Sequence, residues 1–230
     1  MSKRKMVSAV FTGVAAAGVT VVGAPAAFAT SGHWVIKNNA GNPIANSTAY
    51  LAINTAPATL TAGTTTLNCP VSTASATGKF FQNAPVGGEV ASVGTANFGP
   101  GGSCSLAGIF KFKASLATSH TPLKLIASGS TNGVVTGKVE EKSANTPIVA
   151  KITATAGLTC SASVSGVSVP ATFNNNTHIL AFNPNKVKTL HIKANHGCPG
   201  LTAGQSASFQ AAYGIHSPSS MSLGTITDPS

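Results

Sequence analysis

Short runs of alternating hydrophobic and polar residues recur from about residue 32 to the end of the chain, and Gly, Pro and Asn separate them. No stretch carries apolar residues at helical spacing with charged residues opposite over three turns, so the pattern predicts strands and not helices. About a dozen short strands with regular turn signals indicate a sandwich or a barrel. The expected strands cover residues 32–37, 48–53, 59–69, 79–82, 89–98, 109–113, 122–128, 134–142, 148–160, 162–173, 178–182, 188–193, 207–213 and 221–226.

The clearest single strand runs from Ile109 to Lys113. Phe110 and Phe112 fall on one of its faces, and Lys111 and Lys113 fall on the other. Proteins that bind single-stranded nucleic acid place aromatic and basic side chains on the same face. The opposed arrangement therefore predicts that the phenylalanines are in the core and the lysines are in solvent, and it predicts no specific nucleic-acid partner.

Three turns punctuate the strands. Asn132–Gly133 lies between two apolar runs and is a strong signal for a two-residue hairpin. Asn183–Pro184–Asn185 is a second expected turn, and the glycine-rich segment 99–102 is expected to reverse the chain, because it needs φ values that only Gly adopts freely.

Two stretches of the chain echo each other. Cys69, Phe80, Cys104 and Phe112 recur in order and at similar spacing as Cys160, Phe173, Cys198 and Phe209. We interpret this echo as an internal duplication: an all-β fold of tandem antiparallel β-sandwich or barrel units, a first β unit at 30–132 and a second at 133–230. Two small domains and two halves of one pseudo-symmetric fold are both compatible with the pattern.

The four cysteines are expected to form two disulfides, although four cysteines permit three connectivities. The duplication favours Cys69–Cys104 and Cys160–Cys198, one bridge in each unit. No two cysteines are close in sequence, whereas zinc sites usually draw ligands from short-spaced pairs, so a metal site is not expected.

Residues 1–29 have the pattern of an export signal. Three basic residues precede a run of apolar and small residues, and Ala27–Phe28–Ala29 is a small-x-small cleavage site. We expect a mature chain that begins near Thr30 and keeps no transmembrane anchor, in a secreted protein that is extracellular or associated with the cell wall.

Charge is sparse and one-sided. The formal net charge is +10, and the acidic residues are Glu89, Glu140, Glu141 and Asp228. An exported basic protein is attracted over long range to anionic cell-envelope polymers, to phospholipid surfaces or to nucleic acid. The lysines are scattered along the sequence, however, which is also typical of an ordinary solvated surface.

The chain resembles a group of actinobacterial secreted proteins of unassigned function. The resemblance rests on the small-residue signal peptide, on 133–137 (Gly-Val-Val-Thr-Gly), on Cys160 with the following Val164–Ser165–Gly166, on Phe173–Asn174–Asn175 and on 197–201 (Gly-Cys-Pro-Gly-Leu). It covers most of the mature chain and implies secretion and β-structure, but it brings no catalytic residues.

Catalytic signals are missing. There is no Gly-x-Ser-x-Gly motif, and a catalytic triad would have to draw its carboxylate from four acids that lie in no recognisable motif. Glu140 and Glu141 are adjacent, so on a strand they point to opposite faces and are expected to form a surface pair beside Lys138 and Lys142.

The histidines and the large aromatic residues leave alternatives open. His191 and His196 are five apart and are expected on opposite faces of a strand, which does not favour a metal site. His120 and His216 occupy equivalent places in the two units, which favours a shared structural role. Trp34 and Tyr213 are candidates for an exposed carbohydrate platform, although Trp34 is also typical of a residue packed over an open end of a sheet.

These observations predict a secreted, non-catalytic β protein with a binding or structural role at or near the cell surface, without cofactor. A secreted hydrolase with a scattered site is the alternative. A pore-forming protein is a further one, although a transmembrane barrel needs longer strands and girdles of aromatic residues. The oligomeric state is open, because edge strands can pair.

Overall fold

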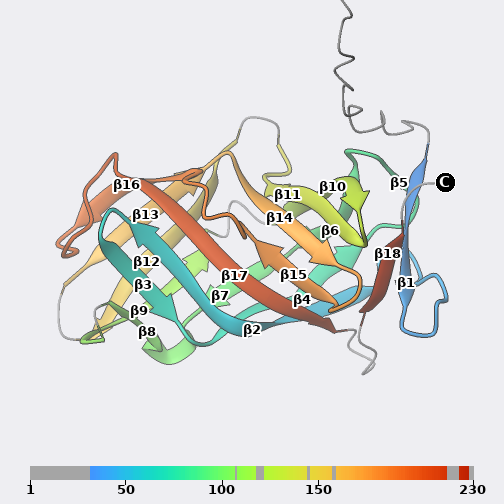
Figure 1. The fold of residues 1–230 in the computed structure, drawn as a ribbon. Coiled ribbons are helices and arrows are strands. Elements are labelled where there is room, and N and C mark those ends of the chain that lie inside the picture. Colours follow the sequence, from blue (N-terminus) through green and yellow to red (C-terminus); the bar gives the residue numbers. More distant parts are fainter. Residues whose placement is uncertain are drawn as a thin grey trace, which may run out of the picture.

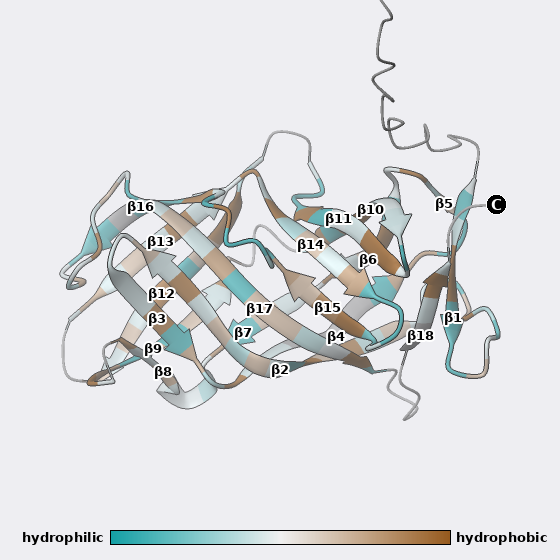
Figure 2. Ribbon diagram, viewed as in Figure 1, coloured by the Kyte–Doolittle hydropathy of each residue, from teal (hydrophilic) through white to brown (hydrophobic). Residues whose placement is uncertain are grey.

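The computed structural model describes residues 32–106, 108–117, 122–143, 146–156, 159–216 and 223–227. The expected signal peptide, 1–29, lies outside these residues. Antiparallel strands dominate the described chain, and it contains no α-helix. The all-β, antiparallel fold class is therefore confirmed. In Figure 2 hydrophobic and hydrophilic positions alternate along most strands, as strands with one buried face require.

The strands are β1 (His33–Asn38), β2 (Ala49–Ala62), β3 (Thr65–Cys69), β4 (Ser72–Phe80), β5 (Ala84–Pro85), β6 (Glu89–Val93), β7 (Thr95–Phe98), β8 (Cys104–Leu106), β9 (Phe110–Leu116), β10 (Leu123–Thr131), β11 (Val134–Glu140), β12 (Ile148–Ala156), β13 (Ser161–Gly166), β14 (Ser168–Asn174), β15 (Ile179–Phe182), β16 (Leu190–His196), β17 (Ser206–His216) and β18 (Leu223–Thr227). A short 3-10 turn, η1 (Pro100–Gly102), precedes β8.

The main sheet closes on itself twice (Figure 1). One closed ring consists of eight strands: β2, β3, β8, β9, β12, β13, β16 and β17. We call it the disulfide ring. The other also consists of eight strands, β2, β4, β6, β10, β11, β14, β15 and β17, and we call it the capped ring. The sequence left a sandwich and a barrel open, and the strand pairings form a closed barrel with two tiers.

The strands β2 and β17 cross both rings without interruption, and they pair with each other along their length. The other strands are broken where the rings meet, a zone that we call the seam. Pro70 and Val71 separate β3 from β4, Gly94 separates β6 from β7, Val167 separates β13 from β14, and residues 183–189 separate β15 from β16. Pro has no N–H for a strand ladder and Gly weakens a strand, so these residues favour breaks.

A three-stranded sheet, in the order β18-β1-β5, lies at the far end of the capped ring (Figure 1). Two side-chain amides hold it in place. Gln82 accepts a hydrogen bond from the Ile36 N–H at 2.9 Å and donates one to the Ile44 carbonyl at 2.8 Å. Asn175 donates to the Ile226 carbonyl at 2.8 Å and accepts from the Ile226 N–H at 2.7 Å. Each amide thus takes the place of a neighbouring strand.

Several of the expected strands have different boundaries in the structure. The expected strands 89–98 and 162–173 are each split, at Gly94 and at Val167, and the largest changes involve β2 and β3. Residues 54–58 were expected to interrupt the chain, yet β2 runs from Ala49 to Ala62 through Pro57. The pairing with β17 shifts register on either side of Ala212, opposite this stretch, so the missing N–H of Pro57 falls in an irregular part of the ladder. The expected strand 59–69 instead turns at Gly63, whose φ is 57°, and continues as β3.

The expected turns are confirmed. Thr131 pairs with Val134 across Asn132 and Gly133, whose φ values of 51° and 76° are those of a tight hairpin turn. Asn183 begins its turn with a φ of 47°. Gly99, Gly101 and Gly102 all have positive φ at the chain reversal before β8.

The duplication stays a prediction. Each ring draws strands from both sides of the 132/133 boundary, because β10 pairs with β11, β9 with β12, and β2 with β17. The two predicted units therefore contribute to one continuous sheet.

Candidate functional site

Four lysines gather on the outer face of the disulfide ring. Lys111 and Lys113 project from β9, Lys151 from β12 and Lys193 from β16, and all four are exposed. Their neighbours Phe112, Ile152 and Ile192 are buried, so the lysines share the outer side of the closed sheet.

Strand pairing sets the spacing of these lysines. Lys113 lies opposite Thr153, two residues from Lys151 on the neighbouring strand, and such diagonal neighbours are about 7–8 Å apart. Lys151 lies opposite Ser163 of β13, which in turn pairs with Ala194, next to Lys193. We call Lys111, Lys113, Lys151 and Lys193 the basic face. Its members are scattered in sequence but adjacent in the sheet.

No acidic residue belongs to the strands of the disulfide ring, because the four acids of the chain are Glu89, Glu140, Glu141 and Asp228. Asp228 lies outside the described residues. Glu89 begins β6 and Glu140 ends β11, both in the capped ring. The positive charge of the basic face is therefore not offset by acids on its own strands, which favours attraction of anions.

The acids of the capped ring are paired with its lysines. The Lys138 Nζ lies 2.6 Å from the Glu140 Oε2, and the Lys124 Nζ lies 3.7 Å from the Glu140 Oε1. Partial burial raises the pKa of Glu89 above its usual value, although Lys142 and Lys124 oppose this shift. Glu140 is therefore held in ion pairs, and Glu89 lies in the field of two lysines.

The expectation that Glu140 and Glu141 form a surface pair is wrong for Glu141, which is 6% exposed. Val135 and Val139 of β11 are buried, and Glu141 lies two residues further along the same inward series. Glu140 is on the opposite, outer side, as the alternation predicts.

The expectation that His191 and His196 face opposite sides is also wrong. His191 pairs with Ser165 and His196 with Ser161, while the register shifts between Ser163 and Val164, which leaves Lys193 as an additional residue on β16. This bulged residue places His191 and His196 on the same face of the strand, and both histidines are exposed. His216, at the end of β17, is exposed as well, whereas His120 lies outside the described residues. In the part of the chain that the structure describes, no group of three or more His, Cys, Asp or Glu residues is placed to hold a metal ion.

Neither candidate for a carbohydrate platform is exposed. Trp34 is fully buried on β1, in the three-stranded sheet that closes the capped ring. Tyr213 is buried at the seam, and its hydroxyl lies 3.0 Å from the Ser72 Oγ. Burial raises the pKa of Tyr213 to about 12, and the hydrogen bond with Ser72 opposes the shift.

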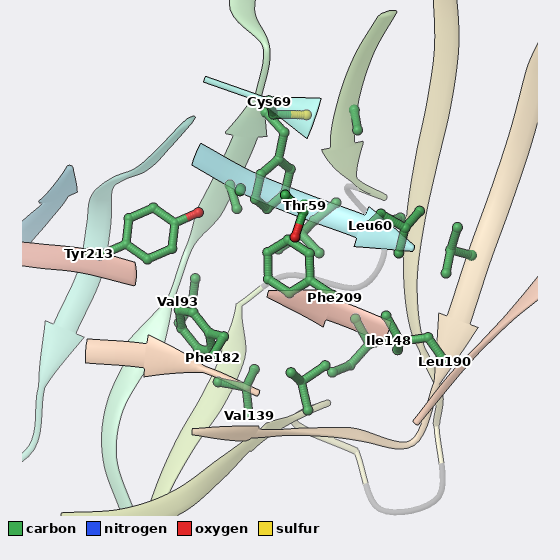
Figure 3. Close-up of a pocket in the computed structure, with 18 of the residues that line it drawn as sticks. Thr59, Leu60, Cys69, Val93, Val139, Ile148, Phe182, Leu190, Phe209 and Tyr213 are labelled. Atoms are coloured by element: carbon green, nitrogen blue, oxygen red, sulfur yellow. The ribbon is translucent and has the colours of Figure 1, made fainter. Parts of the chain in front are cut away.

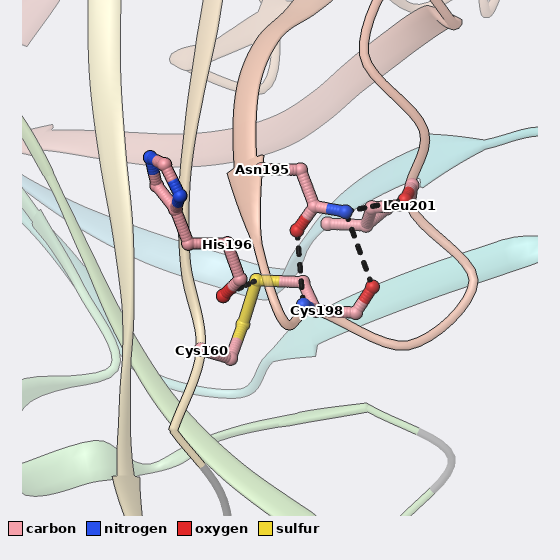
Figure 4. The surroundings of a disulfide bond; sticks show 5 residues. All are labelled: Cys160, Asn195, His196, Cys198 and Leu201. Carbon is pink, nitrogen blue, oxygen red and sulfur yellow. Dashed lines mark hydrogen bonds between the residues drawn. A yellow bond between two sulfur atoms is a disulfide. The ribbon is translucent and has the colours of Figure 1, made fainter.

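Both predicted disulfides are confirmed: Cys69 bonds to Cys104 and Cys160 to Cys198. Both lie in the disulfide ring. Asn195 supports the second one (Figure 4): its side chain accepts from the Cys198 N–H at 2.9 Å and donates to the Leu201 carbonyl at 2.6 Å. These bonds fix the 195–201 turn, which joins β16 to the segment before β17.

A cavity of about 120 Å³ lies inside the closed sheet at the seam. Figure 3 shows Val139, Ile148, Phe182, Leu190 and Phe209 around it, contributed by strands of both rings. Hydrophobic and aromatic side chains from both tiers supply nearly all of its lining.

Sequence reasoning did not single out Lys151 or the cavity. For Lys151 the available signal was alternation: Lys151, Thr153 and Thr155 alternate with apolar residues along β12. For the cavity, the signal was the recurrence of alanine at inward positions, which leaves space where a larger residue would fill it. Such alanines are Ala52, Ala58, Ala96, Ala114 and Ala150.

The comparisons with known proteins supply no assignment: no family model matches the chain, and neither the curated proteins nor the solved structures give a match. Among the described residues, none of the helical segments has the length and apolarity needed to cross a membrane.

Proposed function

We propose that this chain is an exported, non-catalytic binding protein that attaches to anionic polymers of the cell envelope through its basic face. The gathering of Lys111, Lys113, Lys151 and Lys193 on paired strands without any acid is the observation that carries the proposal. The signal pattern in residues 1–29 supports export, and two disulfides are typical of an oxidising compartment.

The chemistry of the face favours a flexible polymer of phosphate or similar anions over a nucleic acid. Phe112 is buried beneath the lysines and Phe110 packs against the core, so neither offers the exposed ring on which bases stack. The neighbouring outer residues are Thr153, Ser115 and Ser163, which donate hydrogen bonds to anionic oxygens without selecting a base.

The non-catalytic part of the proposal is supported by the separation of His191 and His196 from Glu89 and Glu140. His191 and His196 lie on β16 of the disulfide ring, whereas Glu89 and Glu140 lie on β6 and β11 of the capped ring. A triad needs a carboxylate that orients its histidine. No observation favours the hydrolase alternative over a binding role.

The test uses the secreted mature chain, from residue 30, and immobilised inorganic polyphosphate. Binding is expected to fall steeply with salt, because the screening length is about 8 Å at physiological ionic strength. If about four lysines contact a flexible polyanion, the slope of log K against log salt is about −3. Retention that is undiminished in molar salt would overturn the proposal.

Two variants with the same change of charge locate the surface. The first replaces Lys111, Lys113, Lys151 and Lys193 by Gln, and it is expected to lose most of the affinity and most of the salt slope. The matched control replaces Lys37, Lys79, Lys138 and Lys142 by Gln, and it is expected to keep both. Equal loss in the two variants would show that only the net charge matters. Preference for single-stranded DNA or anionic vesicles over polyphosphate would replace the polymer by that partner.

A further inference from the structure

We propose that the cavity at the seam binds one small, uncharged, hydrocarbon-like molecule of the size of a single aromatic ring or a short alkyl chain. This binding site is separate from the basic face, because the cavity lies inside the closed sheet and the lysines lie outside it. Closed sheets of eight strands either fill their interior with side chains or hold one small ligand there.

The lining excludes polar ligands. Tyr50, Thr59 and Tyr213 are the lining residues with a polar side chain. The Tyr50 hydroxyl donates to the Ser92 carbonyl at 2.7 Å, and the Tyr213 hydroxyl is engaged with Ser72. The hydroxyls of Tyr50 and Tyr213 are thus engaged, and Thr59 contributes the one further hydroxyl of the lining; a lining this apolar favours apolar molecules. A polar ligand would have to give up its hydrogen bonds with water for at most this one hydroxyl.

Aromatic rings form one wall of the cavity. Phe98 packs edge-to-face on Phe209 with ring centroids 5.3 Å apart, and Phe182 packs in the same manner on Tyr213 at 5.7 Å. The centroids of Phe182 and Phe209 are 6.4 Å apart, so the four rings are continuous across β7, β15 and β17. This wall suits a flat or slender apolar molecule, and its rings are already packed in place without one.

The seam offers a route to the cavity. Val71, Val167 and Val187 are exposed although they are large hydrophobic residues, and each lies at a break between two strands. Val167 is 65% exposed and lies between Val164 and Val169, which line the cavity.

The segment 183–189 borders the same place, since it connects Phe182 and Leu190, both of which line the cavity. Asn183 fastens this segment: its side chain donates to the Val187 carbonyl and accepts from the Val187 N–H, both at 2.7 Å. The Asn183 N–H donates to the Pro170 carbonyl at 2.6 Å, so this segment lies close to the break at Val167. Loop residues and side chains, and not hydrogen bonds between paired strands, separate the cavity from solvent at this place.

The experiment compares toluene with phenol, which have nearly the same shape and differ by a hydroxyl group. Binding to the mature chain is measured by chemical shifts of the methyl groups of lining residues during titration. Toluene is expected to bind saturably at one site, and phenol is expected to bind at least about tenfold more weakly, because its hydroxyl leaves water for a lining in which only the Thr59 hydroxyl is uncommitted. Absence of saturable toluene binding, or equal affinity for phenol, would overturn the proposal.

Two substitutions on one strand locate the site. Ala150→Leu fills the cavity and is expected to weaken toluene binding at least about tenfold, whereas Ala156→Leu, on the exposed end of β12, is expected to leave it unchanged. Ala114→Leu, on β9, provides the same filling from another strand should Ala150→Leu not fold. Toluene affinity that is unchanged in both filling variants would place the bound molecule elsewhere and refute the assignment.

Discussion

The two rings are held together in different ways. The disulfide ring has covalent links: Cys69–Cys104 joins β3 to β8, and Cys160–Cys198 joins the start of β13 to the turn after β16. The strands of the capped ring contain no cysteine. Its end is covered by the sheet β18-β1-β5, which Gln82 and Asn175 fasten through hydrogen bonds.

The difference extends to charge. The capped ring balances its lysines with Glu89 and Glu140, whereas the disulfide ring carries lysines without acids. Mutual repulsion of like charges on neighbouring strands destabilises a sheet. The covalent links of the disulfide ring therefore offset repulsion among its lysines, while the capped ring combines ion pairs with hydrogen bonds from uncharged amides.

The largest expected effect comes from removing a disulfide. Replacing Cys160 and Cys198 by Ala opens a link between residues separated by 38 positions, and the free energy of unfolding is expected to fall by about 4 kcal/mol. Urea denaturation measures the loss. The pair Cys69 and Cys104, separated by 35 positions, should give nearly the same value.

Hydrogen exchange shows whether this loss is local. Amides of β13 and β16 are expected to lose protection in the variant while those of β10 and β11 keep it. If both rings lost protection equally, the contrast between them would be false and the whole sheet would open as one unit.

A smaller effect is expected at the seam in alkali. The folded pKa of Tyr213 is about 12, whereas an exposed phenol ionises near pH 10. Below about pH 10 both states keep the proton; above it the unfolded state ionises first, so stability falls as pH rises and the loss is complete near the folded pKa. The shift of about two units corresponds to up to about 3 kcal/mol.

Tyr213→Phe removes this contribution, so its unfolding free energy is expected to fall less between pH 10 and 12 than that of the wild type. Denaturation at several pH values measures the slopes. Burial also raises the pKa of Tyr50 in the capped ring, so the single variant keeps a slope and the double variant Tyr50→Phe, Tyr213→Phe flattens it further. An unchanged slope in Tyr213→Phe would show that its hydroxyl is solvated.

The smallest expected effect concerns the three-stranded sheet β18-β1-β5 that covers the capped ring. Asn175→Ala removes both hydrogen bonds to Ile226 and is expected to cost about 2 kcal/mol. The Ile226 amide should then exchange faster, while amides of the disulfide ring stay protected. The exposed neighbour supplies the control, Asn176→Ala, from which little change is expected. Slow exchange at Ile226 in Asn175→Ala would mean that pairing with β1 alone holds β18.

Local patterns in the sequence were enough for the all-β class, for many of the strands, for the turns and for the disulfides. Alternation places Phe112 inside and Lys113 outside, Asn132–Gly133 makes its hairpin, and the echo between the two halves pairs the cysteines correctly. Each of these depends on residues that are close in sequence or on a repeated order of landmarks.

What the sequence did not predict depends on pairing between distant strands. The basic face requires β9 to lie beside β12, and the parity of His191 and His196 requires one bulged residue on β16. Glu141 follows the inward series of β11 although its charge argued for the surface. The cavity results from alanines on several strands that face one interior, which no single strand reveals.

The pairing of β2 with β17 also sets the order in which the chain can fold. The Thr55 hydroxyl donates to the Ala212 carbonyl across this pair although the two residues are 157 positions apart, and both rings close through it. Neither ring can therefore close until nearly the whole chain has emerged from the ribosome. Contacts between such distant residues make folding slow, and until β17 arrives, β2 presents an unpaired edge along which other chains can add. A chain that closes its sheet this late stays unfolded for longer, and the exposed edge of β2 then needs protection from other chains.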